Sequence, residues 1–173
     1  MQASKHLTQA GLFESERYST AILSEDKRYR YLLTRTWDSR LPVFGFLCLN
    51  PSTADETIDD PTVKKCMRFV RSWGGGGLVI SNLFAFRATD PAELKMEKDP
   101  IGPENDKWIE HALNSTAMTI AAWGCHGVYR GRNLDILQRF GDRLCHLRLT
   151  KDNHPSHPLY LPETLRPTPF PAT

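Results

Sequence analysis

The sequence predicts one α/β domain, a three-layer sandwich in which helices cover both faces of a central parallel sheet of four strands, with an N-terminal β-hairpin beside it. Short apolar runs alternate with segments of helical periodicity, which is the pattern of strands joined by crossover helices. The length of 173 residues and the hydrophobic content of 40% suit a single domain with its own core.

Four apolar runs are predicted as the buried strands, because each is short and ends in a turn of polar residues or glycine. They are Val43–Leu49, Leu78–Ile80, Ala117–Ala122 and Leu144–Leu149. Strands joined by right-handed crossovers run parallel, so their carboxyl ends are expected at one edge of the sheet. That edge is where open α/β sheets bind their ligands.

The helices are predicted from their start signals and apolar spacing. Asp60 followed by Pro61 has the form of an N-cap with proline at the first helical position, and apolar residues recur at helical spacing up to Trp73. Gly74–Gly77 are interpreted as a helix C-cap and turn, because the lysine and hydroxyl residue of a phosphate-binding loop are missing. Further helices are expected after Gly102-Pro103 and over Asn133–Phe140, with Leu134, Leu137 and Phe140 facing inward.

The remaining segments flank this sheet. Residues 1–17 are expected to form a flexible leader, residues 18–162 the single α/β domain, and residues 163–173 a proline-rich tail. Tyr18–Leu23 and Arg28–Trp37 surround a polar turn, and their alternation predicts a hairpin with one buried face. The hairpin arginines are interpreted as part of a solvated face, with phosphate contacts as the alternative.

Composition restricts the class of protein. The net charge of +2 neither demands nor excludes a polyanionic partner. The four cysteines include no Cys-x-x-Cys pair, which disfavours a zinc ribbon or a redox dithiol, and no metal or cofactor is expected. No N-terminal signal and no apolar run long enough for a bilayer is found, so a cytoplasmic protein without a membrane partner is expected.

Polar and aromatic residues gather just past the four strands, where a ligand site is expected. The candidates are Asn50, Pro51, Ser52 and Asp55 after the first strand, Asn82, Phe84, Phe86 and Arg87 after the second, Trp123 after the third, and His154 and His157 after the fourth. Each has a structural alternative, since an asparagine caps turns and aromatic rings fill cores. Metal binding by the two histidines with Asp152 is disfavoured, because no ligand geometry is implied.

Several unusual phrases resemble, in the same order, a family of bacterial and phage proteins called domain of unknown function 1643 (DUF1643). They are Leu49–Asp55, Asp59–Thr62, Asn82–Pro91, Asp99–Asp106, Ala122–Gly124 and His157–Leu161. The resemblance covers about residues 18–162. The family supplies no established activity.

The chain is also similar, more distantly, to the uracil-DNA glycosylase-like superfamily, in which polar turns follow successive strands. The matching positions are Asn50-Pro51, Asn82, Trp123-Gly124 and His154-Pro155-Ser156. This resemblance implies the same three-layer architecture and a site for a nucleobase. It also implies DNA or a free nucleobase or nucleotide as the partner, and DNA N-glycosylase-like hydrolysis as the activity.

The resemblance implies a role for each matching residue. Asn50 holds the attacking water, Asn82 reads the base edge, and Phe84 or Phe86 stacks on the base. His154 stabilises the leaving oxygen, with His157 as its rival. Asn50 replaces the water-activating aspartate of the most active glycosylases, so a slow enzyme is expected.

Two other functions are weighed against this one. The first is a binding module without catalysis that holds a nucleotide or small metabolite. The second is a protein-interaction domain, in which the aromatic phrase around Phe84 and Phe86 forms an exposed patch.

Overall fold

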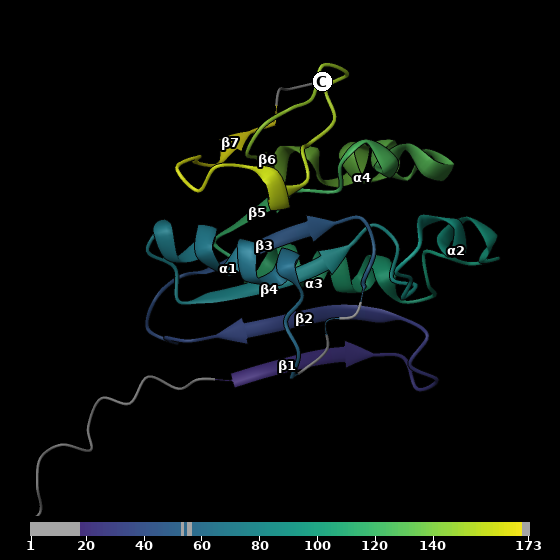
Figure 1. Cartoon of the computed structure of the whole chain (residues 1–173), viewed down its shortest axis with the longest axis horizontal. Coiled ribbons are helices and arrows are strands. Elements are labelled where there is room, and N and C mark those ends of the chain that lie inside the picture. The colour runs from purple at the N-terminus through teal and green to yellow at the C-terminus, as the bar shows by residue number, and fades with distance from the viewer. Residues whose placement is uncertain (1–17, 53, 55–56, 171–173) are drawn as a thin grey trace, which may run out of the picture.

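The computed structural model describes residues 18–52, 54 and 57–170, which form a mixed sheet with helices on both faces (Figure 1). The predicted leader and Asp55 lie outside these residues. The strands are β1 (Tyr18–Leu23), β2 (Arg30–Thr36), β3 (Val43–Cys48), β4 (Gly77–Asn82), β5 (Met118–Ala121), β6 (Leu144–His146) and β7 (Thr168–Pro169). The α-helices are α1 (Pro61–Ser72), α2 (Pro91–Met96), α3 (Asn105–Ser115) and α4 (Arg132–Phe140).

The predicted strands form the centre of the sheet and run parallel in the order β4-β3-β5-β6. The chain passes from β3 to β4 on one side and then crosses to β5 on the other, so the order reverses between β3 and β5. Antiparallel strands extend the sheet beyond this centre, with β2 and β1 next to β4 and β7 next to β6. The predicted parallel sheet is therefore the middle of a larger mixed sheet of seven described strands.

The core lies in two layers on opposite faces of the sheet. Phe46 of β3 packs with Phe69 of α1, whereas the next residue, Leu47, packs with Ile109 of α3 and Ile136 of α4. Successive side chains of a strand point to opposite faces, so β3 contributes to both layers. Helix α1 covers one face, and α3 and α4 cover the other (Figure 1).

The strand β2 corrects the interpretation of the hairpin arginines. Arg30 and Arg35 are 2% and 5% exposed, so the solvated-face interpretation is wrong for both. The physical reason is that β2 lies inside the sheet between β1 and β4, where both of its faces are covered. Arg35 pairs with Asp59 at 2.8 Å, and this ion pair holds the segment before α1 against the sheet.

Other expectations differ from the structure in detail. Helix α2 was not expected, although Asp90 and Pro91 repeat the N-cap and proline signal of α1. Leu134 is 66% exposed, and Ile136 takes the inward position of α4. The proline-rich tail contributes β7 to the edge of the sheet next to β6. None of the described helices is long and apolar enough to cross a bilayer.

The glycine run between α1 and β4 is the predicted turn. Gly74 has φ +82°, a left-handed conformation that favours glycine. Gly76 lies so close to the neighbouring loop that a Cβ would stand 1.9 Å from the backbone oxygen of Asp38. The run therefore permits a tight turn and a close backbone approach.

We expect Gly76→Ala to lower the free energy of unfolding by about 3 kcal/mol, because backbone must move to make room for the methyl group. Gly74→Ala is the matched control, and it should cost only about 1 kcal/mol, since its Cβ meets no atom and only the backbone conformation is strained. Urea unfolding of both variants measures the difference. Equal losses would contradict the close approach at Gly76.

Candidate functional site

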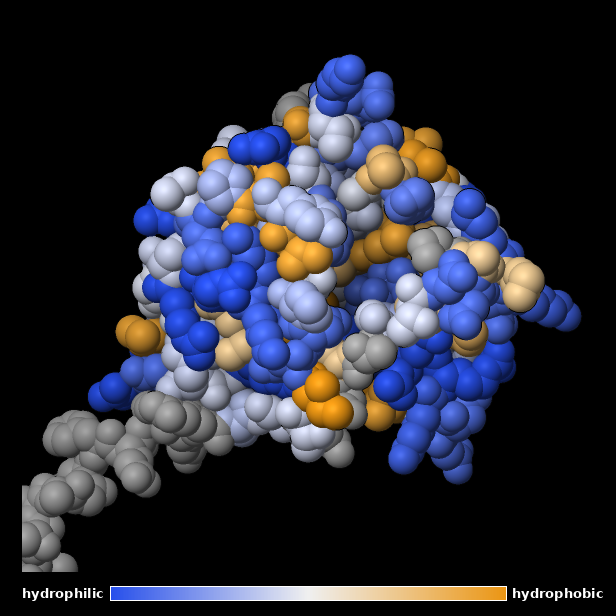
Figure 2. All heavy atoms as spheres, viewed as in Figure 1, coloured by the Kyte–Doolittle hydropathy of each residue, from blue (hydrophilic) through white to orange (hydrophobic). Residues whose placement is uncertain are grey.

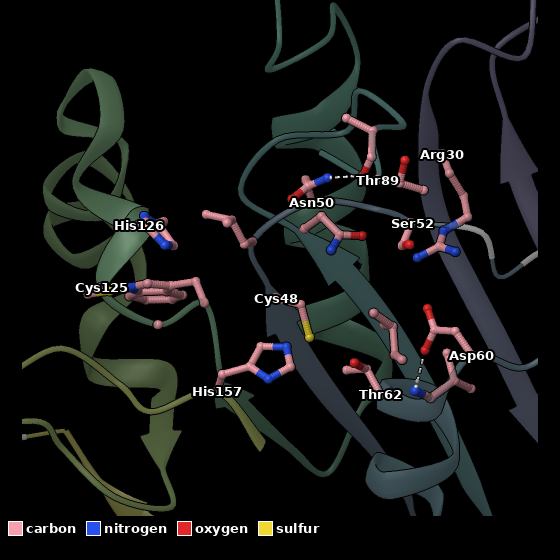
Figure 3. A pocket seen from close by; sticks show the side chains of 17 residues that line it. Arg30, Cys48, Asn50, Ser52, Asp60, Thr62, Thr89, Cys125, His126 and His157 are labelled. Carbon is pink, nitrogen blue, oxygen red and sulfur yellow. Dashed lines mark hydrogen bonds between the residues drawn. The ribbon is translucent and has the colours of Figure 1, made fainter. Parts of the chain in front are cut away.

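A cavity of about 320 Å³, lined by both polar and apolar residues, opens at the carboxyl ends of the parallel strands, where the strand order reverses (Figure 3). This volume is in the range of small-molecule sites. Figure 2 shows the molecule hollowed on the face in view, with many hydrophilic side chains around the hollow. Segments distant in the sequence supply the wall, and their side chains include Arg30, Asn50, Asp60, Asn82, Trp123 and His157.

Asn50 joins the loop after β3 to the loop after β4. Its Nδ2 donates to the backbone oxygens of Ala88 at 2.8 Å and Pro51 at 3.1 Å. The Ala88 N–H donates in turn to the Pro51 oxygen at 3.1 Å. The amino group of Asn50 is thus committed to the turn, and the acceptor that it offers to the cavity is its Oδ1.

Asn82 is the buried last residue of β4 and lies in the cavity wall. The Nδ2 of Asn105 donates to the backbone oxygens of Asn82 at 2.9 Å and Leu83 at 3.0 Å, which fixes the end of the strand. Within the described chain, the Oδ1 of Asn82 has no hydrogen-bond partner, although buried amide oxygens are normally paired. The oxygen is buried and unpaired, and the residue that carries it lines the cavity.

Trp123 and Gly124 form the wall after β5. The ring of Trp123 is 1% exposed, and Gly127 packs so closely on it that a Cβ there would lie 2.2 Å from Cδ1. The Gly124 N–H donates to the backbone oxygen of Pro155 at 2.9 Å and ties this loop to the loop after β6. Gly124 has φ +71°, so glycine permits the turn beside His157.

Of the two candidate histidines, His157 lines the cavity and His154 does not. The backbone of His154 is held in a turn with Thr150, whose Oγ1 accepts its N–H at 3.1 Å. The Nδ1 of His157 accepts the Leu159 N–H at 3.4 Å, so the neutral imidazole carries its proton on Nε2. Burial lowers the pKa of His157, and the negative charge of Asp60 opposes this effect.

The other predicted residues are distributed around the site. Ser52 lines the cavity and also an adjoining open groove, where Phe86 and Arg87 lie. Pro51 is buried in the turn beside Asn50 and is not among the lining residues. Phe84 is fully buried in the layer of α3 and α4, away from the cavity, so it cannot stack on a ligand there.

Arg30 also lines the cavity, whereas its sequence pattern was interpreted as part of a solvated hairpin face, with phosphate contact as the alternative. Its Nη1 donates to the backbone oxygen of Ala54 at 2.5 Å, and burial lowers its pKa to about 10. Asp60 lines the cavity too, although its position in the sequence was explained by helix capping rather than by acid/base chemistry. A strand pattern does not reveal that Arg30 lies on an interior strand, so no local signal singles it out.

A model of a protein family described as "Protein of unknown function (DUF1643)" matches residues 30–159, about three quarters of the chain. The chain belongs to the DUF1643 family. No curated protein and no solved structure matches it. The part of the chain that matches the DUF1643 model begins at Arg30 and contains all residues that line the cavity.

The chemistry of this DUF1643 site rests on amide, guanidinium, carboxylate and imidazole groups. In the described residues, no three histidine, cysteine, aspartate or glutamate side chains are grouped so as to hold a metal ion. Cys66 lies behind the cavity-lining Cys48, and burial raises the pKa of its thiol, which keeps it protonated.

The lowered pKa of His157 predicts a pH-dependent stability. The neutral imidazole is favoured in the folded state, so its contribution is present above pH 6.5, the usual pKa, and is lost as the pH falls below that value. We expect His157→Gln to lose less stability than the wild type between about pH 7 and pH 5. Urea unfolding across this range measures the slopes. His146, whose pKa burial also lowers, leaves a residual slope in the variant, and equal slopes would contradict the prediction.

Proposed function

We propose that the cavity recognises a nucleobase or nucleotide. The observation that carries the proposal is the unpaired, buried Oδ1 of Asn82 in a cavity where four strand-connecting loops converge. A base edge presents N–H donors and carbonyl acceptors in one plane, and such an edge pairs with an amide oxygen and with the Nε2–H of His157. The resemblance to the uracil-DNA glycosylase-like superfamily supports the same ligand class.

The same cavity has groups suited to slow hydrolysis of an N-glycosidic bond. Asn50 Oδ1 orients a water molecule, and the carboxylate of Asp60 accepts its proton as the water oxygen bonds to the anomeric carbon. The bond from this carbon to the base nitrogen breaks, and the base leaves with the electron pair. The Nε2–H of His157 donates to the oxygen on which the negative charge develops.

Two alternative functions are a binding module without catalysis and a protein-interaction domain. A binding module without catalysis uses the same cavity and is distinguished by ligand binding without turnover. A protein-interaction role at the aromatic phrase requires exposed rings, whereas Phe84 is fully buried and Phe86 is half-buried. The cavity is therefore the better candidate for function.

We expect Asn82→Ala to weaken the binding of free nucleobases and nucleosides about tenfold, because a hydrogen bond to a buried acceptor is lost. Isothermal titration calorimetry measures the dissociation constants. Asn114→Ala, at an exposed position of α3, is the matched control and should bind as the wild type does. Wild-type protein that binds no nucleobase, nucleoside or nucleotide would overturn the proposed function.

Hydrolysis is tested with duplexes that carry uracil, hypoxanthine or a mismatch, and with free nucleosides and nucleotides. Alkaline cleavage reveals abasic sites in the duplexes, and chromatography reveals the released base. Asp60→Asn keeps the helix cap but removes the proton acceptor, and we expect it to lower the rate at least about 100-fold. Absence of product with all substrates would remove the hydrolytic activity and leave recognition as the function.

A further inference from the structure

Arg30 is a buried cation with unused hydrogen-bonding capacity in the cavity wall. Its side chain reaches the cavity from β2, and the described part of the chain supplies no partner for its Nε–H. The bond from Nη1 to the Ala54 oxygen satisfies one donor but supplies no negative charge. No carboxylate of the described residues forms an ion pair with it.

The other buried arginines of the described chain are paired. Arg35, five positions along the same strand and 5% exposed, binds Asp59 at 2.8 Å. Arg132, 3% exposed, forms ion pairs with Asp106 and Asp135. A buried guanidinium is costly unless an anion and hydrogen bonds compensate for its lost hydration. Among the described residues, Arg30 is thus the buried arginine that forms no ion pair, and the charge of Asp60 opposes the effect of burial on its pKa.

The surroundings of Arg30 indicate which anion fits. Ser52 and Thr62 bring hydroxyl groups to the same cavity, and Thr62 belongs to the first turn of the 12-residue helix α1, whose N-terminus favours negative charge. Asp60 differs from these groups, because its carboxylate repels an anion. One of its oxygens accepts the Val63 N–H at 2.8 Å, and the side chain also lines the cavity. A carboxylate beside an anion requires a proton between them.

A phosphate monoester meets these requirements. Its second pKa is about 6, so it exists as a monoanion with one P–OH group under mildly acidic conditions. The charged oxygens bind the fork of the Arg30 guanidinium, and the P–OH donates to Asp60. A phosphodiester within a strand carries no such P–OH and leaves the Asp60 carboxylate facing an oxyanion.

We propose that the cavity binds a nucleoside monophosphate, with its phosphate at Arg30 and Asp60 and its base toward Asn82 and His157. Figure 3 shows Arg30 and Asp60 on one side of the cavity and His157 across from them, so the two ends of one ligand meet different walls. This inference rests on the proposed nucleobase recognition and narrows its ligand class to phosphorylated nucleosides. Because the phosphate occupies Asp60, the inference concerns recognition and not the hydrolytic step, in which Asp60 accepts a proton from water. It assigns Arg30, for which phosphate contact was the alternative interpretation of the hairpin, as the anion anchor.

Calorimetric titration with nucleosides, their 5′-monophosphates and inorganic phosphate tests the assignment. We expect the monophosphate to bind at least about tenfold more tightly than its nucleoside, and Arg30→Gln to abolish this preference. Arg35→Gln is the matched control: it breaks a buried ion pair on the same strand outside the cavity and should keep the preference. Equal affinity of the wild type for nucleoside and monophosphate would overturn the inference while the proposed function stands.

Titration with inorganic phosphate tests the anion anchor at Arg30 independently of nucleobase recognition. Binding of phosphate that is lost in Arg30→Gln, without binding of any nucleoside or nucleotide, supports the anion anchor and overturns nucleobase recognition.

Thermal unfolding adds a measurement that needs no ligand. Arg30→Met should lower the melting temperature much less than Arg35→Met, because loss of Arg35 leaves the Asp59 carboxylate unpaired, whereas Arg30 forms no ion pair with a described residue. An equal loss would indicate a structural role for Arg30.

The role of Asp60 is tested by pH. We expect the affinity of the wild type for the monophosphate to fall as the pH rises from about 5.5 to about 8, since the P–OH is lost over this range. Asp60→Asn keeps the helix cap and can donate to a dianion, so its affinity should depend much less on pH. His126, His157 and Arg30 also line the cavity and are present in both proteins, so the difference between the two pH dependences reports on Asp60. The same pH dependence in both proteins would exclude a shared proton between Asp60 and the phosphate.

Discussion

The antiparallel pairing of β2 with β4 is the constraint on which the site depends. Leu33 pairs with Ile80, so the first residue of β2 lies beside the carboxyl end of β4. The Arg30 N–H donates to the Ala85 oxygen at 2.9 Å just past that end. An added strand running in the other direction thus brings its N-terminal residue to the edge where the parallel strands deliver their loops. A parallel strand in the same place would carry Arg30 to the opposite edge.

Hydrogen bonds to backbone oxygens then hold the loops in place in pairs. The loop after β3 is bound to the loop after β4 through Asn50 and Ala88, and Gly124 binds the loop after β5 to Pro155. Phe170 of the tail stacks on Trp123 with ring centroids 6.4 Å apart, which adds support from β7. Side chains held by such contacts lose little freedom when a ligand binds, and preorganisation of this kind increases affinity.

The elements that depend on local chemistry were predictable, and those that depend on distant neighbours were not. The strand before Asn50 and the start of α1 at Asp60 and Pro61 follow from short signals that act within a few residues. The burial of Arg30 depends on which strand β2 pairs with, and that partner is about 50 residues away. The pairing of β7 with β6 is likewise decided by an open sheet edge and not by its two-residue sequence.

The same division applies to the site. Asn82, Trp123 and His157 were found because parallel strands must end at one edge, which is a rule of topology. Phe84 was misplaced because the residue after a strand can point to either face, and here it fills the layer of α3 and α4. Its ring packs on Tyr129 with centroids 5.6 Å apart, so the core takes the aromatic group that the ligand was expected to use.

The charges of the cavity wall itself suit a small ligand better than a polymer. Arg30 and Asp60 lie on the same wall with opposite charges, and the lowered pKa of His157 keeps its imidazole neutral near pH 7. The adjoining groove is lined by Lys27, Arg28 and Arg87 together with Glu93, and Arg28 is paired with Glu97 at 2.8 Å. A protein that follows a nucleic-acid backbone needs several cations that replace counterions along the strand. Among the described residues that line the cavity, Arg30 is the only arginine or lysine, and a single cation matches one phosphate better than a row of phosphates. The cations of the groove lie outside the cavity.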